Sequence, residues 1–359
     1  MNICILDILK KFNPQVKGYS TGTDLKTRDL WFNAAIAGAR SRGIPDQARE
    51  LIGRMQNDSR TNFENDWKVV TIFIGGNDLC ALDRDPVGAS PESYIKTLEE
   101  GLDILHAEMP RTLVNLVEIL DIYLLPQVAH GFGSTAACRA AQATECNYVS
   151  TANDTELEVI KVINDEYQRQ TEELIATGKY DTKDDFTVVI QPFIKDTVLP
   201  YTEDGQVDST YFAPDCFHFS TKGHAMAAVN LWNNMMEPVG SKTTVWGITD
   251  LKCPTQENPY IFTSKNSKPA IVPTDSPTTT TTTTKPTTTK KPAATSPAQT
   301  DPTVVCNETC SQVVPDWGIA LLVVTGVALL LQMLVVICIT SRKHSKPKAA
   351  EVYKNGIAL

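Results

Sequence analysis

The segment VVTIFIGG, residues 69–76, decides the fold of this 359-residue chain. It is a continuous apolar run, rich in β-branched residues, that ends in two glycines. Such a run is typical of a strand buried in a parallel sheet, and glycines let the chain turn tightly into a loop. We therefore expect a buried strand whose carboxyl end delivers a loop to a site.

Helix-like and strand-like segments alternate on both sides of this run. Helices are predicted at residues 44–55, 91–109, 156–177 and 222–236, and further strands at residues 113–120 and 186–191. This order predicts an α/β fold, a three-layer α/β/α arrangement with helices on both faces of a parallel sheet. Because sites form at the carboxyl ends of such strands, we expect functional residues after each strand and just before the last helix.

The C-terminal region contains an uncharged run, GIALLVVTGVALLLQMLVVICIT, at residues 318–340. As a helix it would span about 35 Å, more than the roughly 30 Å of a hydrocarbon core. We predict a transmembrane helix at residues 317–340, with a buried core helix as the alternative. The basic cluster SRKHSKPK follows, so the positive-inside rule predicts a cytoplasmic tail at residues 341–359 and an outside location for the rest.

The residues before this span differ from the rest in composition. Residues 277–303 are mostly Thr, Pro, Lys and Ala, which cannot bury a core. This composition is typical of an extended O-glycosylated stalk, and a plain disordered linker is the alternative. We assign residues 1–250 to a globular domain and residues 251–316 to the stalk.

Several features predict a compartment outside the cytosol. Three N-x-S/T sequons, at Asn57, Asn153 and Asn307, predict N-glycans. The nine cysteines fit an oxidising compartment, so we expect disulfides, although the sequence does not assign the pairs. No Cys/His quartet has zinc-ligand spacing. The net charge of -9, with no basic stripe in the folded region, argues against nucleic-acid binding.

The first residues, MNICILDILKKFNP, make a poor signal peptide. They lack a basic start, and Asp7 interrupts their short apolar run. A domain outside the membrane needs such a signal, so we expect the natural chain to begin upstream of Met1. The predicted domain is then incomplete at its N-terminus.

Two segments with catalytic residue types stand at the expected places. GGND, residues 75–78, follows the first strand, and Asn77 can present an NH₂ donor to a developing oxyanion. An ordinary strand-end turn is the alternative. Asp215 lies three residues before His218, so its carboxylate can accept the imidazole Nδ1–H and leave Nε2 as a base. A pair in a surface loop is the alternative there.

A third motif, GYSTG at residues 18–22, matches the G-x-S-x-G nucleophile elbow. The elbow requires a strand before the serine and a helix after it. Here KKFNP precedes the motif and a polar loop follows, so Ser20 is a weak candidate for a nucleophile. It nevertheless leaves an α/β-hydrolase, with chain order Ser–Asp–His, as an alternative.

Taken together and in order, several blocks resemble the GDSL, or SGNH, hydrolases, and in particular their membrane-anchored phospholipase B group. The blocks are GYSTGT, WFNAAIAGA, WKVVTIFIGGNDLC, LDILHAEMPRTLVNLVEIL, DDFTVVIQPF and FAPDCFHFSTKGHAMAAVNLWNNMMEPVG. The resemblance covers residues 5–250 and includes the C-terminal anchor. It implies an SGNH-like fold and the repeat nearest the membrane.

The resemblance also implies roles for individual residues. Asp215 and His218 match the Asp and His of the family's triad, Asn77 matches its side-chain oxyanion donor, and the amide of Gly38 matches its backbone donor. No metal or cofactor is implied. The family's Gly-Asp-Ser block, which carries the nucleophile, does not occur in the chain. We expect that serine upstream of Met1, on a first strand that lies inside the sheet and is missing here.

The function implied by this resemblance is hydrolysis of fatty-acyl esters of phospholipids and lysophospholipids through a Ser-Asp-His acyl-enzyme mechanism. The implied placement is a single-span type I protein of the plasma membrane, apical in location. Two alternatives stay open. The chain can be a catalytically inactive, truncated membrane glycoprotein, or an α/β-hydrolase that uses Ser20.

Overall fold

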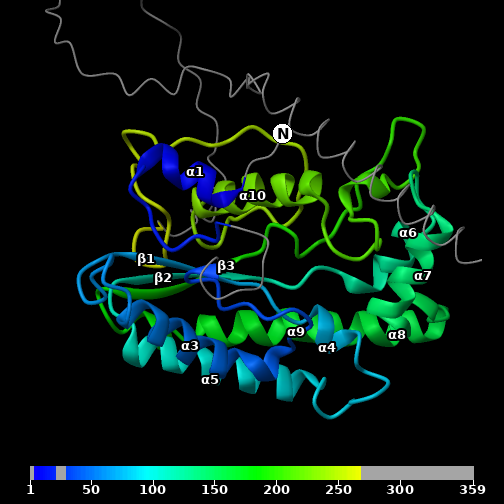
Figure 1. The fold of residues 1–359 in the computed structure, drawn as a ribbon, viewed down its shortest axis with the longest axis horizontal. Coiled ribbons are helices and arrows are strands. Elements are labelled where there is room, and N and C mark those ends of the chain that lie inside the picture. Colours follow the sequence, from blue (N-terminus) through cyan, green and yellow to red (C-terminus); the bar gives the residue numbers. More distant parts are fainter. Residues whose placement is uncertain (1–3, 22–29, 268–359) are drawn as a thin grey trace, which may run out of the picture. The chain divides into compact units, whose positions relative to one another are not determined.

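The computed structural model describes residues 4–21 and 30–267, drawn as coloured ribbons in Figure 1. The predicted membrane span, the predicted tail and the sequon at Asn307 lie outside these residues. Within the part of the chain that is described, no helix is both long enough and apolar enough to cross a membrane.

The sheet has three strands: β1 (Lys68–Ile72), β2 (Thr112–Val117) and β3 (Phe186–Gln191). Neighbouring strands run parallel in the order β1-β2-β3, so that Val70, Val114 and Val188 lie side by side. Every residue of β2 is buried, as expected for a central strand covered on both faces. The α/β fold with a parallel sheet that the sequence predicts is therefore confirmed.

The strand formed by the apolar run at residues 69–76 is shorter than predicted. β1 ends at Ile72, and Phe73 to Gly75 are irregular. Gly75 has a φ of 121°, which glycine adopts without a steric penalty and which takes the chain out of the sheet. The predicted loop at the carboxyl end of the strand therefore begins within the apolar run itself.

Three helices cover one face of the sheet, below it in Figure 1: α3 (Ile44–Gln56), α5 (Pro91–Glu108) and α9 (Asp154–Ala176). α5 packs against both of the others. Its Leu98, Leu102 and Leu105 are fully buried at helical spacing. These helices were predicted to within two residues at each end, because their apolar spacing is a local signal. Ser90 and Asn153 cap the starts of α5 and α9.

The other face is covered by α10 (Thr221–Met235) and α1 (Ile5–Phe12), above the sheet in Figure 1. Phe12 stacks on Trp232 with ring centroids 4.9 Å apart, and Ile8 is buried in the same apolar cluster. α10 lies where the sequence predicts a helix. α1 was not predicted, because its residues were considered only as a signal peptide. Helices thus lie on both faces of the sheet.

Short helices occupy the connections: η1 (Ser41–Gly43), α4 (Gly76–Leu79), η2 (Ile122–Leu124), α6 (Leu125–Val128), α7 (Ala136–Glu145), α8 (Asn147–Thr151), η3 (Lys179–Asp181) and η4 (Ser209–Tyr211). Two disulfides join them to the frame. Cys80, after α4, pairs with Cys146, and Cys138, in α7, pairs with Cys216 in the loop before α10. The expected disulfides are therefore present, with a pairing that the sequence left open.

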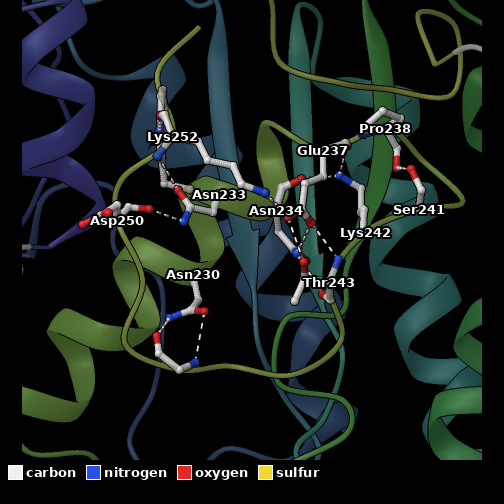
Figure 2. Close-up of polar contacts among 12 residues, drawn as sticks. Asn230, Asn233, Asn234, Glu237, Pro238, Ser241, Lys242, Thr243, Asp250 and Lys252 are labelled. Carbon is white, nitrogen blue, oxygen red and sulfur yellow. Dashed lines mark hydrogen bonds and ion pairs between the residues drawn. The ribbon is translucent and has the colours of Figure 1, made fainter. Parts of the chain in front are cut away.

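Asparagines of α10 fasten the segment that follows the helix (Figure 2). Asn230 donates to the carbonyl oxygen of Gly247 at 2.8 Å and accepts the N–H of the same residue at 3.2 Å. Asn233 donates to Asp250 O and accepts the N–H of Lys252, both at 2.8 Å. Each amide side chain satisfies one backbone donor and one backbone acceptor. The returning segment is thereby held along α10 without forming a strand.

Residues 251–267, which the sequence analysis assigned to the stalk, make contacts with the domain. Phe262 is buried, and its N–H donates to Met235 O at 2.9 Å. Ser264 Oγ donates to Asp181 Oδ2 at 2.6 Å. These residues cover the C-terminal end of α10 and the region beside η3.

One edge of the sheet is open among the described residues. Val69 and Phe73, on the outer strand β1 and just after it, are 43% and 44% exposed. Lys68 N–H donates to Arg111 O, so in the alternating parallel ladder the N–H groups of Val69 and Thr71 point away from β2. A cavity of about 1170 Å³ runs along this edge.

Candidate active site

Asp215 and His218 lie in the loop that leads into α10, and the structure brings their side chains together. His218 Nδ1 and Asp215 Oδ2 are 2.8 Å apart, while Asp215 Oδ1 accepts the N–H groups of Phe217 and His218 at 3.0 Å each. Partial burial would raise the pKa of Asp215, but these hydrogen bonds outweigh it and lower the pKa. The ionised carboxylate can therefore orient the imidazole through Nδ1.

This loop is held from α7. Cys216 has a left-handed φ of 53°, which is unfavourable for a residue with a Cβ, and its disulfide to Cys138 anchors it there. Gln142 Nε2 donates to Cys216 O at 2.8 Å, and Ala213 N–H donates to His218 O at 2.7 Å. The positions of Asp215 and His218 are thus set by a cross-linked frame.

Asn77 and Gly38 come from two loops on the other side of the site. Asn77 lies in α4, one turn beyond β1, and its Nδ2 donates to Ala39 O at 2.9 Å. A carboxamide carries two N–H protons, so one remains available to a ligand. Gly38 has a φ of 72°, and none of the described residues accepts its backbone N–H. The hydrogen bond to Ala39 keeps the two candidate donors adjacent.

Asp78, next to Asn77, links the loop after β1 to the loop that carries Gly38 through hydrogen bonds from Ser41. The sequence did not predict this contact. Asp78 is fully buried, and it accepts Ser41 N–H at 2.9 Å and Ser41 Oγ–H at 2.7 Å. Burial raises the pKa of Asp78, and the bonds from Ser41 offset only part of that rise. The GGND segment marks Asp78 as a polar residue after a strand. The sequence does not show that its partner is Ser41, 37 residues upstream.

Gly38, Asn77 and His218 all line the cavity along β1. Asn77 and His218 also line a second cavity of about 540 Å³, which lies on the α10 side and is mostly apolar. The residues singled out from the sequence as oxyanion donors and base thus converge on one region. It lies beyond the carboxyl end of β1, where a parallel sheet is expected to hold its site.

Ser20 lines the larger cavity as well, but it stands on irregular backbone. Its Oγ lies 3.4 Å from Leu30 O and 3.4 Å from Asn33 Nδ2. The strand and helix that a nucleophile elbow requires do not flank it in the described residues. Within residues 4–21 and 30–267, no serine hydroxyl is hydrogen-bonded to His218 Nε2.

His224, on the first turn of α10, is a further candidate that the sequence did not single out. It lines the smaller cavity together with His218, and its ring meets the edge of Phe219 at 5.7 Å. The surrounding atoms lower the pKa of His224, and the nearby imidazole of His218 lowers it further. Only its position six residues after His218 could have suggested this proximity.

The sequons at Asn57 and Asn153 both lie on exposed residues. Asn153 caps α9 through its Oδ1, which accepts the backbone N–H groups of Thr155 and Glu156. These bonds do not use Nδ2, the atom to which an N-glycan would be attached. Asn57 Nδ2 donates to Gly53 O at 2.7 Å. Among the described residues, no group of three or more His, Cys, Asp or Glu side chains is arranged to hold a metal ion.

Comparisons with known proteins identify the family. Residues 5–231 match the family GDSL-like Lipase/Acylhydrolase. The chain is 44% identical over 269 residues to "Phospholipase B1, membrane-associated" of Homo sapiens, and 43% over 268 residues to that of Mus musculus. Each alignment covers 73% of this chain and 18% of the relative, so the chain spans less than a fifth of their length. The chain belongs to the GDSL-like lipase/acylhydrolase family, as a phospholipase B-like member.

Proposed function

We propose that the domain hydrolyses fatty-acyl esters of phospholipids and lysophospholipids through an acyl-enzyme intermediate. The observation that carries this proposal is the His218–Asp215 pair, which faces the same cavity as Asn77 and Gly38. The names of the relatives supply the substrate class, since both are phospholipases. The geometry supplies a base and oxyanion donors at one place, as acyl transfer requires.

The proton chemistry follows from the imidazole. Asp215 accepts Nδ1–H and holds the neutral tautomer in which Nε2 carries the lone pair. Nε2 takes the proton of a serine hydroxyl as its oxygen bonds to the ester carbonyl carbon. It then returns the proton to the leaving alcohol oxygen. In the second half of the reaction, Nε2 accepts a proton from water as the water oxygen bonds to the acyl carbonyl carbon. The bond from that carbon to the serine oxygen then breaks, the serine oxygen takes the proton back from Nε2, and the fatty acid is released.

The oxyanion that forms at the carbonyl oxygen needs fixed donors. In this proposal they are the second N–H of Asn77 Nδ2 and the backbone N–H of Gly38. The first N–H of Asn77 is tied to Ala39 O, so the side chain does not have to reorient when charge develops. Asp78 and Ser41 act as positioning residues, because they hold both loops to each other.

The reaction also needs a nucleophile beside His218 Nε2. The open edge of β1 offers a place for one, since a further parallel strand that pairs there would bring its carboxyl end next to Asn77. We include in the proposal a serine at the end of such a strand, outside the described residues. Ser20 is the alternative, because it lines the same cavity.

A second candidate is a non-catalytic membrane glycoprotein. The observation in its favour is that, in the described part of the chain, no hydroxyl is hydrogen-bonded to His218 Nε2. In either case we propose a type I protein of the plasma membrane, apical in placement, with a stalk and a single span at residues 317–340 and glycans at Asn57, Asn153 and Asn307. Glycosidase shifts and protease accessibility on intact cells test that topology.

Labelling with a fluorophosphonate tests the function, because this reagent traps a serine activated by a neighbouring base. The 359-residue chain and a chain lengthened at its N-terminus by the proposed strand and serine are labelled in parallel, and the modified residue is located by peptide mass spectrometry. Label on an upstream serine supports the proposal. Label on Ser20 supports the α/β-hydrolase mechanism. The absence of label from both proteins supports the non-catalytic alternative.

A further inference from the structure

His224 places a second imidazole beside the one that the proposed mechanism uses. It lies on the first turn of α10, and its ring lines the smaller cavity together with His218 and Asn77. The two imidazoles are close enough for a charge on His218 to act on His224. The mechanism as described so far gives His224 no part, although it stands next to the proposed base.

The ring nitrogens of His224 are available to a ligand. The ring is supported on one side by Phe219, which it meets edge to face with the centroids 5.7 Å apart. The backbone N–H of His224 donates to Ser220 O at 2.8 Å, so the helix fixes the main chain. Among the described residues, no hydrogen bond uses either ring nitrogen. The residue is exposed, and water therefore reaches these nitrogens.

The surroundings of His224 favour its neutral form. The protein atoms around the ring lower its pKa, and the charge of His218 lowers the pKa further. The N-terminal end of α10 carries partial positive charge, which acts in the same direction. A neutral imidazole has one N–H donor and one acceptor nitrogen. His224 can therefore accept a hydrogen bond beside His218 and remain uncharged.

We propose that His224 holds the water molecule that hydrolyses the acyl-enzyme. One proton of the water passes to His218 Nε2 as the water oxygen bonds to the acyl carbon. The other proton stays on that oxygen, in a hydrogen bond to the acceptor nitrogen of His224. The bond from the acyl carbon to the serine oxygen then breaks, the serine oxygen takes the proton from Nε2, and His224 is unchanged. This inference rests on the proposed function and deepens it, because it assigns a residue to deacylation alone.

This role is confined to water, because every other hydroxyl in the reaction carries a single proton. In acylation, the serine hydroxyl gives its proton to His218 and has no second proton for His224. The same holds for an added alcohol that takes the acyl group in place of water. Loss of His224 should therefore slow hydrolysis of the acyl-enzyme and leave acyl transfer to an alcohol almost unchanged.

Competition between water and methanol for the acyl-enzyme tests this role. The chain lengthened at its N-terminus is given lysophosphatidylcholine in dilute methanol, and fatty acid and fatty-acid methyl ester are quantified. His224→Phe should raise the ratio of methyl ester to fatty acid by about tenfold, because one hydrogen bond to the transition state is lost. His224→Gln, whose carbonyl oxygen accepts a hydrogen bond, should restore most of the wild-type ratio. An unchanged ratio in His224→Phe would overturn the proposal, and the ratio does not depend on the fraction of protein that is folded.

The proximity of the two imidazoles can be tested without any hydrolysis. NMR signals of the histidine ring C–H groups report the pKa of His224 in the 359-residue chain. This pKa should rise in His218→Ala, because a neighbouring charge is removed. His130→Ala, at an exposed histidine that lines neither cavity, is the control and should leave it unchanged. An unchanged pKa in His218→Ala would mean that the rings are too far apart to share a water molecule, and would refute the role.

Failure of the proposed function gives a different result. Neither fatty acid nor methyl ester is then formed, no serine is labelled by the fluorophosphonate, and the role of His224 is lost with the function. Turnover and labelling together with an unchanged methanol ratio refute only the role of His224 and leave the hydrolase in place.

Discussion

The two halves of the candidate site differ in how completely they are built. The half that carries His218 and Asp215 is cross-linked by a disulfide and satisfied by hydrogen bonds from Gln142 and the loop backbone. The half along β1 presents exposed Val69 and Phe73 and outward-facing backbone groups. The Asp215–His218 pair is thus held in place, while the neighbouring sheet edge is open among the described residues. In the proposed mechanism, proton transfer and nucleophile delivery therefore depend on separate parts of the fold.

The largest effect on hydrolysis is expected from a change in the half of the site that carries His218 and Asp215. In a chain lengthened at its N-terminus by the proposed strand and its serine, His218→Ala should lower fatty-acid release from lysophosphatidylcholine by about 10⁴-fold or more, because the proposed nucleophile loses its base. Circular dichroism and the melting temperature should stay near those of wild type, since the imidazole is exposed. His130→Ala is the control, as His130 is an exposed histidine that lines neither cavity. Near wild-type turnover in His218→Ala would remove this residue from the mechanism.

The disulfide between Cys138 and Cys216, which holds the loop of His218, should contribute to the free energy of unfolding. Replacing both Cys138 and Cys216 by serine opens a loop with a sequence separation of 78 residues, and the expected cost is about 4 kcal/mol in the free energy of unfolding. Urea denaturation of the double variant measures this. Cys4→Ser, at an exposed position, serves as the control. A double variant with wild-type stability would show that hydrogen bonds alone hold the loop.

Glu118 is a buried carboxyl group that lacks the hydrogen-bond partners of Asp215. Glu118 follows β2, is 2% exposed, and neither carboxyl oxygen has a hydrogen-bond partner among the described residues. Burial raises the pKa of Glu118 to about 8, against the pull of Lys195 and with support from Glu172 and Asp196. The folded state therefore keeps a proton that the unfolded state loses.

The pKa of Glu118 is raised in the folded state. The free energy of unfolding therefore falls as pH rises from about 4.5 to about 8, because the unfolded chain releases the proton that the folded protein keeps. The slope in this window is about 1.4 kcal/mol per pH unit. Glu118→Gln should flatten the pH dependence of the unfolding free energy between these values, as measured by urea titrations at several pH values. A profile parallel to that of wild type would mean that Glu118 is ionised in the folded protein.

The smallest effect is expected at the open edge. Val69→Thr should change the unfolding free energy of the 359-residue chain by less than about 0.5 kcal/mol, because Val69 is already exposed. Val114→Thr, at a buried position on β2, should cost about 2 kcal/mol as a control. A large loss from Val69→Thr in this chain would show that something already covers the edge.

Much of the fold could be predicted from the sequence, for identifiable reasons. The residues of β3 were predicted without error, and α3, α5, α9 and α10 to within two residues, because apolar periodicity and capping residues are local signals. α1 was missed because a short amphipathic run next to the first residue resembles a failed signal sequence. β1 was predicted too long because the backbone turn at Gly75 is not visible in the apolar pattern.

The site was predictable only in part. The proximity of Asp215 to His218 follows from three residues of spacing, and the structure places them in contact. The bond of Asp78 to Ser41, the disulfide pairs and the cavity face of α10 depend on segments that meet only after folding. Such contacts carry no signature in a single sequence, because the spacing between the partners has no periodicity.

Hydrolysis by two versions of the protein tests whether the nucleophile is delivered by a further strand beside β1. Fatty-acid release from lysophosphatidylcholine is measured for the 359-residue chain and for a chain lengthened at its N-terminus by roughly fifty to sixty residues, enough for the proposed strand and its loop. The account predicts activity only in the extended protein, together with a higher melting temperature because β1 gains a partner. Robust turnover by the 359-residue chain that is lost in Ser20→Ala would contradict it.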